Sequence, residues 1–132
     1  KKSKYLLDTC IILSTKYDYD IPNTVKELCK LPGIGPKMGY IAMQVAWKSN
    51  AGIGVDVHCH RICNSRIMFT NGKCKKPDDT RKYLESWIPK QLWPGFNRLI
   101  VGFGQNVCKP KKPLCSHCII NNVCPFTNKN LD

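Results

Sequence analysis

A glycine- and proline-rich turn, LPGIGPK at residues 31–37, separates two stretches of helical periodicity in this chain of 132 residues. Apolar residues such as Val25 and Leu28 precede the turn at the i, i+3 spacing of one helix face, and Ile41 resumes that period after it. The pattern predicts two helices joined by a hairpin over about residues 24–47, the first of them ending near residue 31.

The residues of the turn favour contact with a phosphate group. Gly33 and Gly35 permit positive φ angles and a close backbone approach, and Pro36 suits the first turn of a helix. The N–H groups that begin a helix are unpaired and lie at the positive end of its dipole. We therefore expect Gly33, Gly35 and Lys37 to bind a phosphodiester, although a Gly/Pro turn between helices is more often only a turn.

The charge balance points to a polyanionic partner. Lysine and arginine number 21 against nine aspartates and glutamates, which gives a formal net charge of +12. Two lysine patches, at residues 73–76 and 109–112, contribute to this excess. Nucleic acid is the first candidate, because no apolar run of about 18 residues predicts a membrane span.

The nine cysteines fall into two groups, and their odd number argues against a fully paired disulfide framework. Four of them are separated by six, two and five residues, which predicts a metal or cluster site at Cys108, Cys115, Cys118 and Cys124. The spacing favours an iron–sulfur cluster, with zinc as the alternative.

Asp56 is a carboxylate set between two valines, directly before a helical run. An N-cap role alone would account for such a residue. Further helices are expected over residues 5–15, largely buried, from Asp78 or Asp79 onward, and over Trp93–Gly102 with Leu99 facing inward.

Three of these motifs, in this order, resemble the endonuclease III family of DNA glycosylases with AP-lyase activity. They are LPGIGPK, GIGVDVHCHRICN and the four spaced cysteines, and VGFGQ at residues 101–105 is similar to the family's eukaryotic members. The resemblance covers about residues 4–126. It implies an all-α fold, the C-terminal part of the helix-hairpin-helix glycosylase architecture, without the helices that precede Tyr5 in the family.

Two domains are implied by this resemblance. Residues 1–64 would belong to a helical barrel domain that contains the hairpin and the Asp56 segment. Residues 65–132 would form a helical iron–sulfur domain, with the cluster loop at 108–124. The chain departs from the family at Asn64-Ser65-Arg66, where one residue is inserted, so we carry no DNA-binding role onto Arg66.

The implied activity is removal of oxidised pyrimidines from DNA, followed by strand nicking through a lysine Schiff base. Lys37 would be the nucleophile, Asp56 the second catalytic residue, and the four spaced cysteines the ligands of a [4Fe–4S] cluster. The residues expected at DNA phosphates in the cluster loop are Lys109, Lys111 and Lys112. The partner would be double-stranded DNA with a damaged pyrimidine or abasic site, bound by a monomer in the nucleus, a mitochondrion or another DNA-containing organelle.

Two other functions remain open from the sequence. A noncatalytic DNA-binding module could use the same hairpin and metal loop to hold the DNA backbone. An adenine-specific glycosylase of the same superfamily would share the cluster and the aspartate, but generally lacks a lysine at the position of Lys37.

Overall fold

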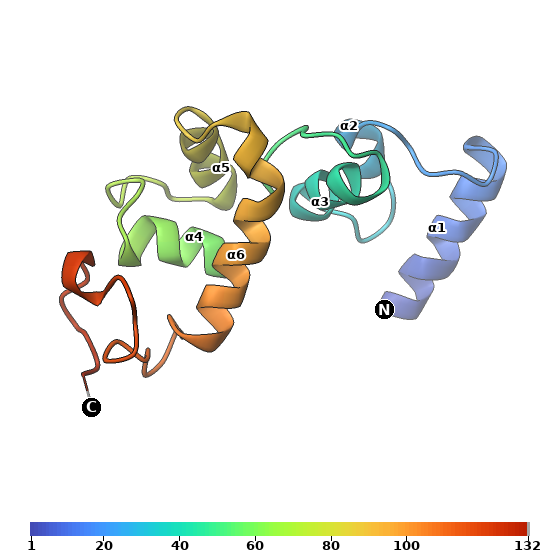
Figure 1. Cartoon of the computed structure of the whole chain (residues 1–132). Helices are drawn as coiled ribbons and strands as arrows, with labels where there is room; N and C mark the ends of the chain where they lie inside the picture. The colour runs from blue at the N-terminus through green and yellow to red at the C-terminus, as the bar shows by residue number, and fades with distance from the viewer. Residues whose placement is uncertain (132) are drawn as a thin grey trace. The chain divides into compact units, whose positions relative to one another are not determined.

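The structure, a computed structural model, describes residues 1–131; residue 132, at the end of the second expected domain, lies outside them. Helices are the only regular elements of this described part, as the all-α prediction requires (Figure 1). No helix within residues 1–131 is long and apolar enough to cross a membrane.

The chain divides into two compact units, residues 1–54 and the residues from Val55 onward. This division lies before the boundary that we expected after residue 64. Asp56 therefore shares a unit with the four spaced cysteines.

The first unit contains α1 (Lys2–Lys16), α2 (Val25–Leu28) and α3 (Pro36–Ala46). Leu28, Leu31 and Met43 form its buried core, with partly buried side chains from α1 packed against them. The helix expected over residues 5–15 is present, but its expected burial is wrong. No residue of α1 is buried, and Leu6 is 69% exposed.

Helix α2 is shorter than the periodicity suggested and ends at Leu28. Its start is fixed by Thr24, whose hydroxyl accepts a 3.2 Å hydrogen bond from the Glu27 N–H. The Glu27 carboxylate in turn accepts from the Tyr17 hydroxyl at 2.8 Å, which joins the connector after α1 to the hairpin.

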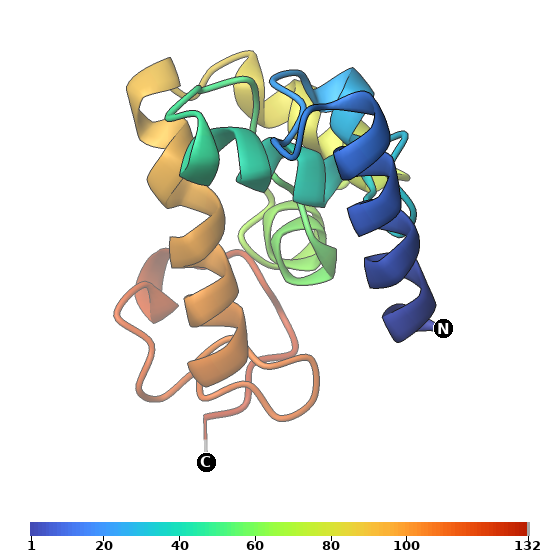
Figure 2. The same cartoon turned by 90° about the vertical axis from the view of Figure 1, so that its right-hand side faces the viewer.

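The second unit contains α4 (Val57–Arg61), a π-helical turn η1 (Ile62–Arg66), α5 (Pro77–Glu85), and α6 (Trp93–Asn106). Short 3₁₀ turns lie at η2 (Lys90–Leu92) and η3 (Asn121–Val123). Helix α4 packs against α5 and α6, and the loop after α6 carries the spaced cysteines (Figure 2).

The packing of α4 on α6 depends on Gly104. A Cβ added there would lie 2.9 Å from Cδ1 of Ile62 and 3.1 Å from Cβ of His58. Ile62 is fully buried and Ile100 nearly so, whereas Leu99, which we expected to face inward, is 70% exposed. Helix α6 therefore presents one narrow face to α4.

Candidate functional site

The turn between α2 and α3 has the backbone geometry expected of a hairpin. Gly33 has a φ of 79°, and a Cβ added to it would lie 2.8 Å from Cδ2 of Tyr5. Gly35 is the N-cap of α3 in an extended conformation, and a Cβ added there would meet nothing within 4 Å. Gly33 is thus required by conformation and by packing, whereas Gly35 leaves open space beside the first N–H groups of α3.

Lys37 is exposed in the first turn of α3, next to this open space. The backbone of Gly54 packs against the same turn, because a Cβ on Gly54 would lie 3.1 Å from the Lys37 carbonyl oxygen. The same Cβ would lie 2.8 Å from Cγ1 of Ile41. Gly33, Gly35 and Lys37 thus lie in one exposed turn, and their roles in binding and chemistry stay predictions.

Asp56 begins helix α4 in the second unit. Its Oδ1 atom accepts a 2.7 Å hydrogen bond from the main-chain N–H of Cys59, and the residue is half-buried. The structure therefore supports the N-cap interpretation. The catalytic role of Asp56 stays a prediction.

Cys59, Cys63 and Cys74 belong to the packed interior of the second unit. A hydrogen bond with Cys63, together with burial, raises the pKa of the Cys59 thiol far above its usual value. A thiol that stays protonated is a poor nucleophile and a poor metal ligand. Cys59 is therefore a structural residue, and Cys63 and Cys74 are buried in the same unit.

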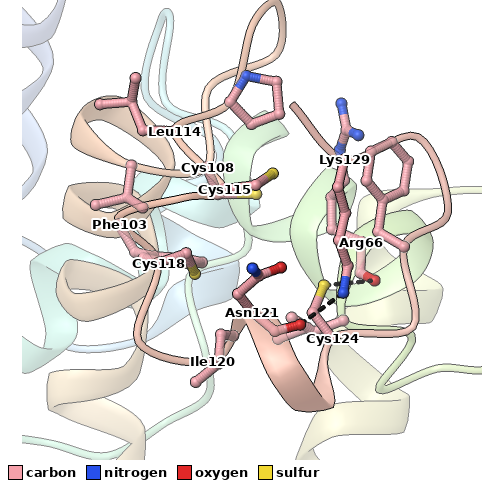
Figure 3. Close-up of a pocket in the computed structure, with 14 residues that line it drawn as sticks. Arg66, Phe103, Cys108, Leu114, Cys115, Cys118, Ile120, Asn121, Cys124 and Lys129 are labelled. Atoms are coloured by element: carbon pink, nitrogen blue, oxygen red, sulfur yellow. Dashed lines mark hydrogen bonds between the residues drawn. The ribbon is translucent and has the colours of Figure 1, made fainter. Parts of the chain in front are cut away.

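The four spaced cysteines line a single pocket of the second unit (Figure 3). Their sulfur atoms face one another across it, and the other lining residues are mainly apolar, including Phe103, Val107 and Ile120. The chain folds back on itself after α6 to bring thiols from Cys108 to Cys124 together. The four cysteines thus line one pocket, and their role as metal or cluster ligands stays a prediction.

Four thiol donors in one pocket are chemically suited to an iron–sulfur cluster or to zinc, and the two groups need different spacings of the sulfurs. Among residues 1–131, no three His, Cys, Asp or Glu side chains are placed to bind one metal ion. A tetrahedral zinc site needs sulfurs about 3.8 Å apart, because each Zn–S bond is about 2.3 Å long. In a [4Fe–4S] cluster each thiolate binds a different iron, so the sulfurs surround a wider space.

Asn121, which lines the same pocket, has a side chain that would suit a cluster bound there. Its Oδ1 atom is buried and has no hydrogen-bond partner among the described residues. A half-turn of the amide would exchange oxygen for nitrogen and place an N–H donor there. Such a donor suits sulfur atoms that carry negative charge.

Arg61 ties the first of these cysteines to helix α4, and we did not single it out from the sequence. Its Nη2 donates a 2.7 Å hydrogen bond to the Cys108 carbonyl, and its Nη1 lies 3.9 Å from the Cys108 sulfur. Burial raises the pKa of the Cys108 thiol, and the hydrogen bond from Arg61 opposes that rise. The contact joins residues 47 positions apart, so no local sequence pattern pointed to it.

The three loop lysines lie between the first two cysteines of the pocket. Lys109, Lys111 and Lys112 are all exposed, and Lys112 has a positive φ of 47°. Their side chains are free of the packing that holds the cysteines. The geometry is open to a phosphate partner, and the DNA contact itself stays a prediction.

Comparisons with known proteins support the interpretation of the hairpin and match most of the chain. The helix-hairpin-helix motif family matches residues 16–40. The chain is 49% identical over 128 residues to endonuclease III-like protein 1 of Gallus gallus, covering 97% of this chain and 45% of that protein. It is 47% identical over 131 residues to the endonuclease III homolog of Schizosaccharomyces pombe, covering 98% of this chain and 36% of that protein.

Solved structures show the same fold. A non-covalent endonuclease III–DNA complex superposes with a TM-score of 0.83 at 30% identity, covering 94% of this chain and 56% of that chain. A thermostable thymine-DNA glycosylase, at 22% identity, gives a TM-score of 0.80 over 94% of this chain and 57% of that one. The chain spans less than half the length of the two relatives named above. From its hairpin, its helical fold and these similarities, the chain belongs to the endonuclease III family and resembles its eukaryotic members.

Proposed function

We propose that this chain carries the DNA-binding hairpin, the two catalytic residues and the cluster domain of a base-excision-repair DNA glycosylase with AP-lyase activity. The observation that carries the proposal is the exposed Lys37 in the first turn of α3, beside the space that Gly35 leaves open at the start of the helix. A primary amine at a helix start can meet a DNA backbone held by the neighbouring N–H groups. Its partner is double-stranded DNA that contains an oxidised pyrimidine or an abasic site.

The reaction begins with extrusion of the damaged nucleotide, because its glycosidic carbon is not accessible inside the stacked duplex. The free amine of Lys37 attacks the C1′ carbon, and the base leaves with the electrons of the broken glycosidic bond. Opening of the sugar ring gives a Schiff base between Lys37 and C1′. Removal of a C2′ proton then drives β-elimination, which breaks the C3′–O bond and releases the 3′ phosphate.

Asp56 has the second catalytic role in this proposal. An ammonium group cannot attack carbon, so the proposed role of this carboxylate in the first step is to help keep the nucleophile deprotonated. The same negative charge stabilises the positive charge that develops on the sugar as the base departs. Only one oxygen of Asp56 is needed for the 2.7 Å cap bond to Cys59, so the other can take part in the chemistry.

The cluster has a structural role. Cys108, Cys115, Cys118 and Cys124 would hold a [4Fe–4S] cluster, which supplies thiolate–iron bonds that cross-link the loop. Lys109, Lys111 and Lys112 project from this loop and would contact phosphates on the DNA. The enzyme would act as a monomer in the nucleus, with mitochondria and other DNA-containing organelles as further locations.

Borohydride trapping on an abasic duplex tests the proposal. An imine between Lys37 and the sugar should be reduced to a stable adduct, and the modified peptide should contain residue 37. A protein that binds the duplex tightly but forms no adduct would instead be a noncatalytic DNA-binding module. Excision of adenine without strand nicking would indicate the adenine-specific alternative.

A further inference from the structure

Two arginines five residues apart reach the same cysteine loop, which a regular α-helix would not permit. On an α-helix, residues i and i+5 point about 140° apart. Between Arg61 and Arg66 lies η1, where the Ile67 N–H donates to the Ile62 carbonyl at 2.9 Å, an i+5 bond of the π type. The wider turn accommodates one more residue than an α-helical turn, and it directs both side chains to one side.

Arg66 contacts two segments of the loop that are distant in sequence. Its Nη2 donates a 3.2 Å hydrogen bond to the Pro110 carbonyl, between the first and second pocket cysteines. Its guanidinium carbon lies 3.7 Å from the centre of the Phe126 ring, two residues after the fourth cysteine. Its main-chain oxygen lies 3.9 Å from the Cys124 sulfur.

We propose that Arg66 is a positioning residue that joins the beginning and the end of the cysteine loop around its pocket. We call the contacts of Arg66 with Pro110 and Phe126 the Arg66 bridge. The inference rests on the proposed cluster, because its function is to slow loss of iron from the four cysteines. It also fixes the backbone at Pro110, between the flanking residues Lys109 and Lys111.

The chemistry of the bridge requires arginine. A planar guanidinium can stack on an aromatic ring and donate in its own plane to a carbonyl at the same time. An ammonium at this position keeps the charge but has a compact shape that cannot make both contacts. Arg66→Lys should therefore restore only part of what Arg66→Gln removes.

Iron release tests the bridge in the intact protein without measuring catalysis. Wild type, Arg66→Gln, Arg66→Lys and the control Arg98→Gln are mixed with an iron chelator, and release is followed with time. Arg98 is exposed on α6 and does not line the pocket. Loss of the bridge should speed release roughly tenfold, a factor that corresponds to about 1.4 kcal/mol.

A proteolysis measurement reports the loop directly. Trypsin can cut after Lys111 but not at Lys109 or Lys112, since each of these precedes a proline. The Arg66→Gln variant should be cut faster at Lys111 than the Arg98→Gln control. A double-mutant cycle with Phe126→Leu should show that the two substitutions are not additive, because they remove the same contact.

The outcomes separate this inference from the proposed function. If wild type contains no iron or acid-labile sulfide, the proposed cluster is wrong. If wild type holds a cluster and Arg66→Gln releases iron and is cut at the rates of Arg98→Gln, the bridge is wrong. Full recovery by Arg66→Lys would also overturn it, because charge alone would then explain the effect.

The role of η1 has its own test. Deleting Ser65, an exposed residue of this turn, would leave Arg66 four residues after Arg61, and residues i and i+4 of a regular α-helix point only about 40° apart. The deletion variant should therefore keep both arginines on the side of the loop and release iron at a rate near that of wild type. Release as fast as that of Arg66→Gln from a folded deletion variant would contradict this account of the π turn.

Discussion

The carboxylate of Asp56 accepts a 2.7 Å hydrogen bond from the main-chain N–H of Cys59, so the proposed catalytic residue also begins helix α4. Asparagine can replace the oxygen of this cap, whereas alanine cannot. Asp56→Ala should lower the free energy of unfolding by about 1 kcal/mol, and Asp56→Asn by only a few tenths.

The same pair of variants separates the cap from the chemistry. Asp56→Asn should retain affinity for an uncleavable abasic duplex but lose turnover, because it lacks the negative charge. Single-turnover nicking of a duplex with an oxidised pyrimidine measures the turnover. Urea unfolding measures the contribution of the cap to stability. Wild-type turnover by Asp56→Asn would show that the charge is not required.

Lys37→Gln should abolish the covalent imine, because an amide is not a nucleophile toward the sugar carbon. The measurement is borohydride trapping on an abasic duplex, read on a denaturing gel. Lys26→Gln is the matched control, since Lys26 is also an exposed lysine of the hairpin but lies on α2. A trapped adduct that persists in Lys37→Gln would mean that another amine forms the Schiff base.

Protein purified without oxygen should contain four iron atoms per chain in a [4Fe–4S] cluster. Cys118→Ser should lose this iron and disorder the loop, because it removes one of the four pocket thiols. Cys74→Ala should keep its iron, since Cys74 is buried away from the spaced cysteines. Iron, zinc and acid-labile sulfide analysis checks both variants, and stoichiometric zinc without iron in the wild type would contradict the prediction.

DNA affinity should fall steeply with salt. Contact with about six phosphates gives a slope near −5 for log K against log salt on duplex DNA. Removing Lys111 and Lys112 together should reduce the magnitude of the slope by about 2. Lys2→Gln/Lys4→Gln removes the same charge from α1 and should leave the slope nearly unchanged. Equal slopes for both double variants would place the DNA elsewhere.

Two glycines of α6 should respond in opposite directions to alanine. Gly104→Ala places a Cβ 2.9 Å from Cδ1 of Ile62 and should lower the free energy of unfolding by about 1–3 kcal/mol. Gly102→Ala meets nothing within 4 Å and should raise it by up to about 1 kcal/mol through helix propensity. Urea unfolding of the two variants measures both effects, and equal stabilities would show that α4 and α6 do not pack closely at Gly104.

Local sequence patterns were sufficient for the hairpin and for the N-cap of helix α4. Glycine favours the positive φ angle found at Gly33, and proline favours the first turn of a helix, where Pro36 lies. The turn and the start of α3 could therefore be predicted from these two residues. The cap at Asp56 is equally local, because its partner is three residues away. Family resemblance then supplied the expected roles, which these contacts alone do not determine.

Burial could not be predicted as well as helix formation. Helix α1 has the apolar residues of an interior helix, yet Leu6 is 69% exposed. Periodicity identifies an apolar face but not the element that will cover it. The same limit applies to α6, where Leu99 is 70% exposed and the adjacent Ile100 is only 7% exposed.

The sequence by itself determined the helices, the hairpin turn and the spacing of four thiols, because each depends on residues close together in the chain. Only the tertiary structure decided the surroundings of those thiols. Arg61 meets Cys108 across 47 positions and Arg66 meets Pro110 across 44. The π-helical turn at η1 places Arg66 on the side of the loop, and contacts between residues so far apart in the chain leave no local sequence pattern.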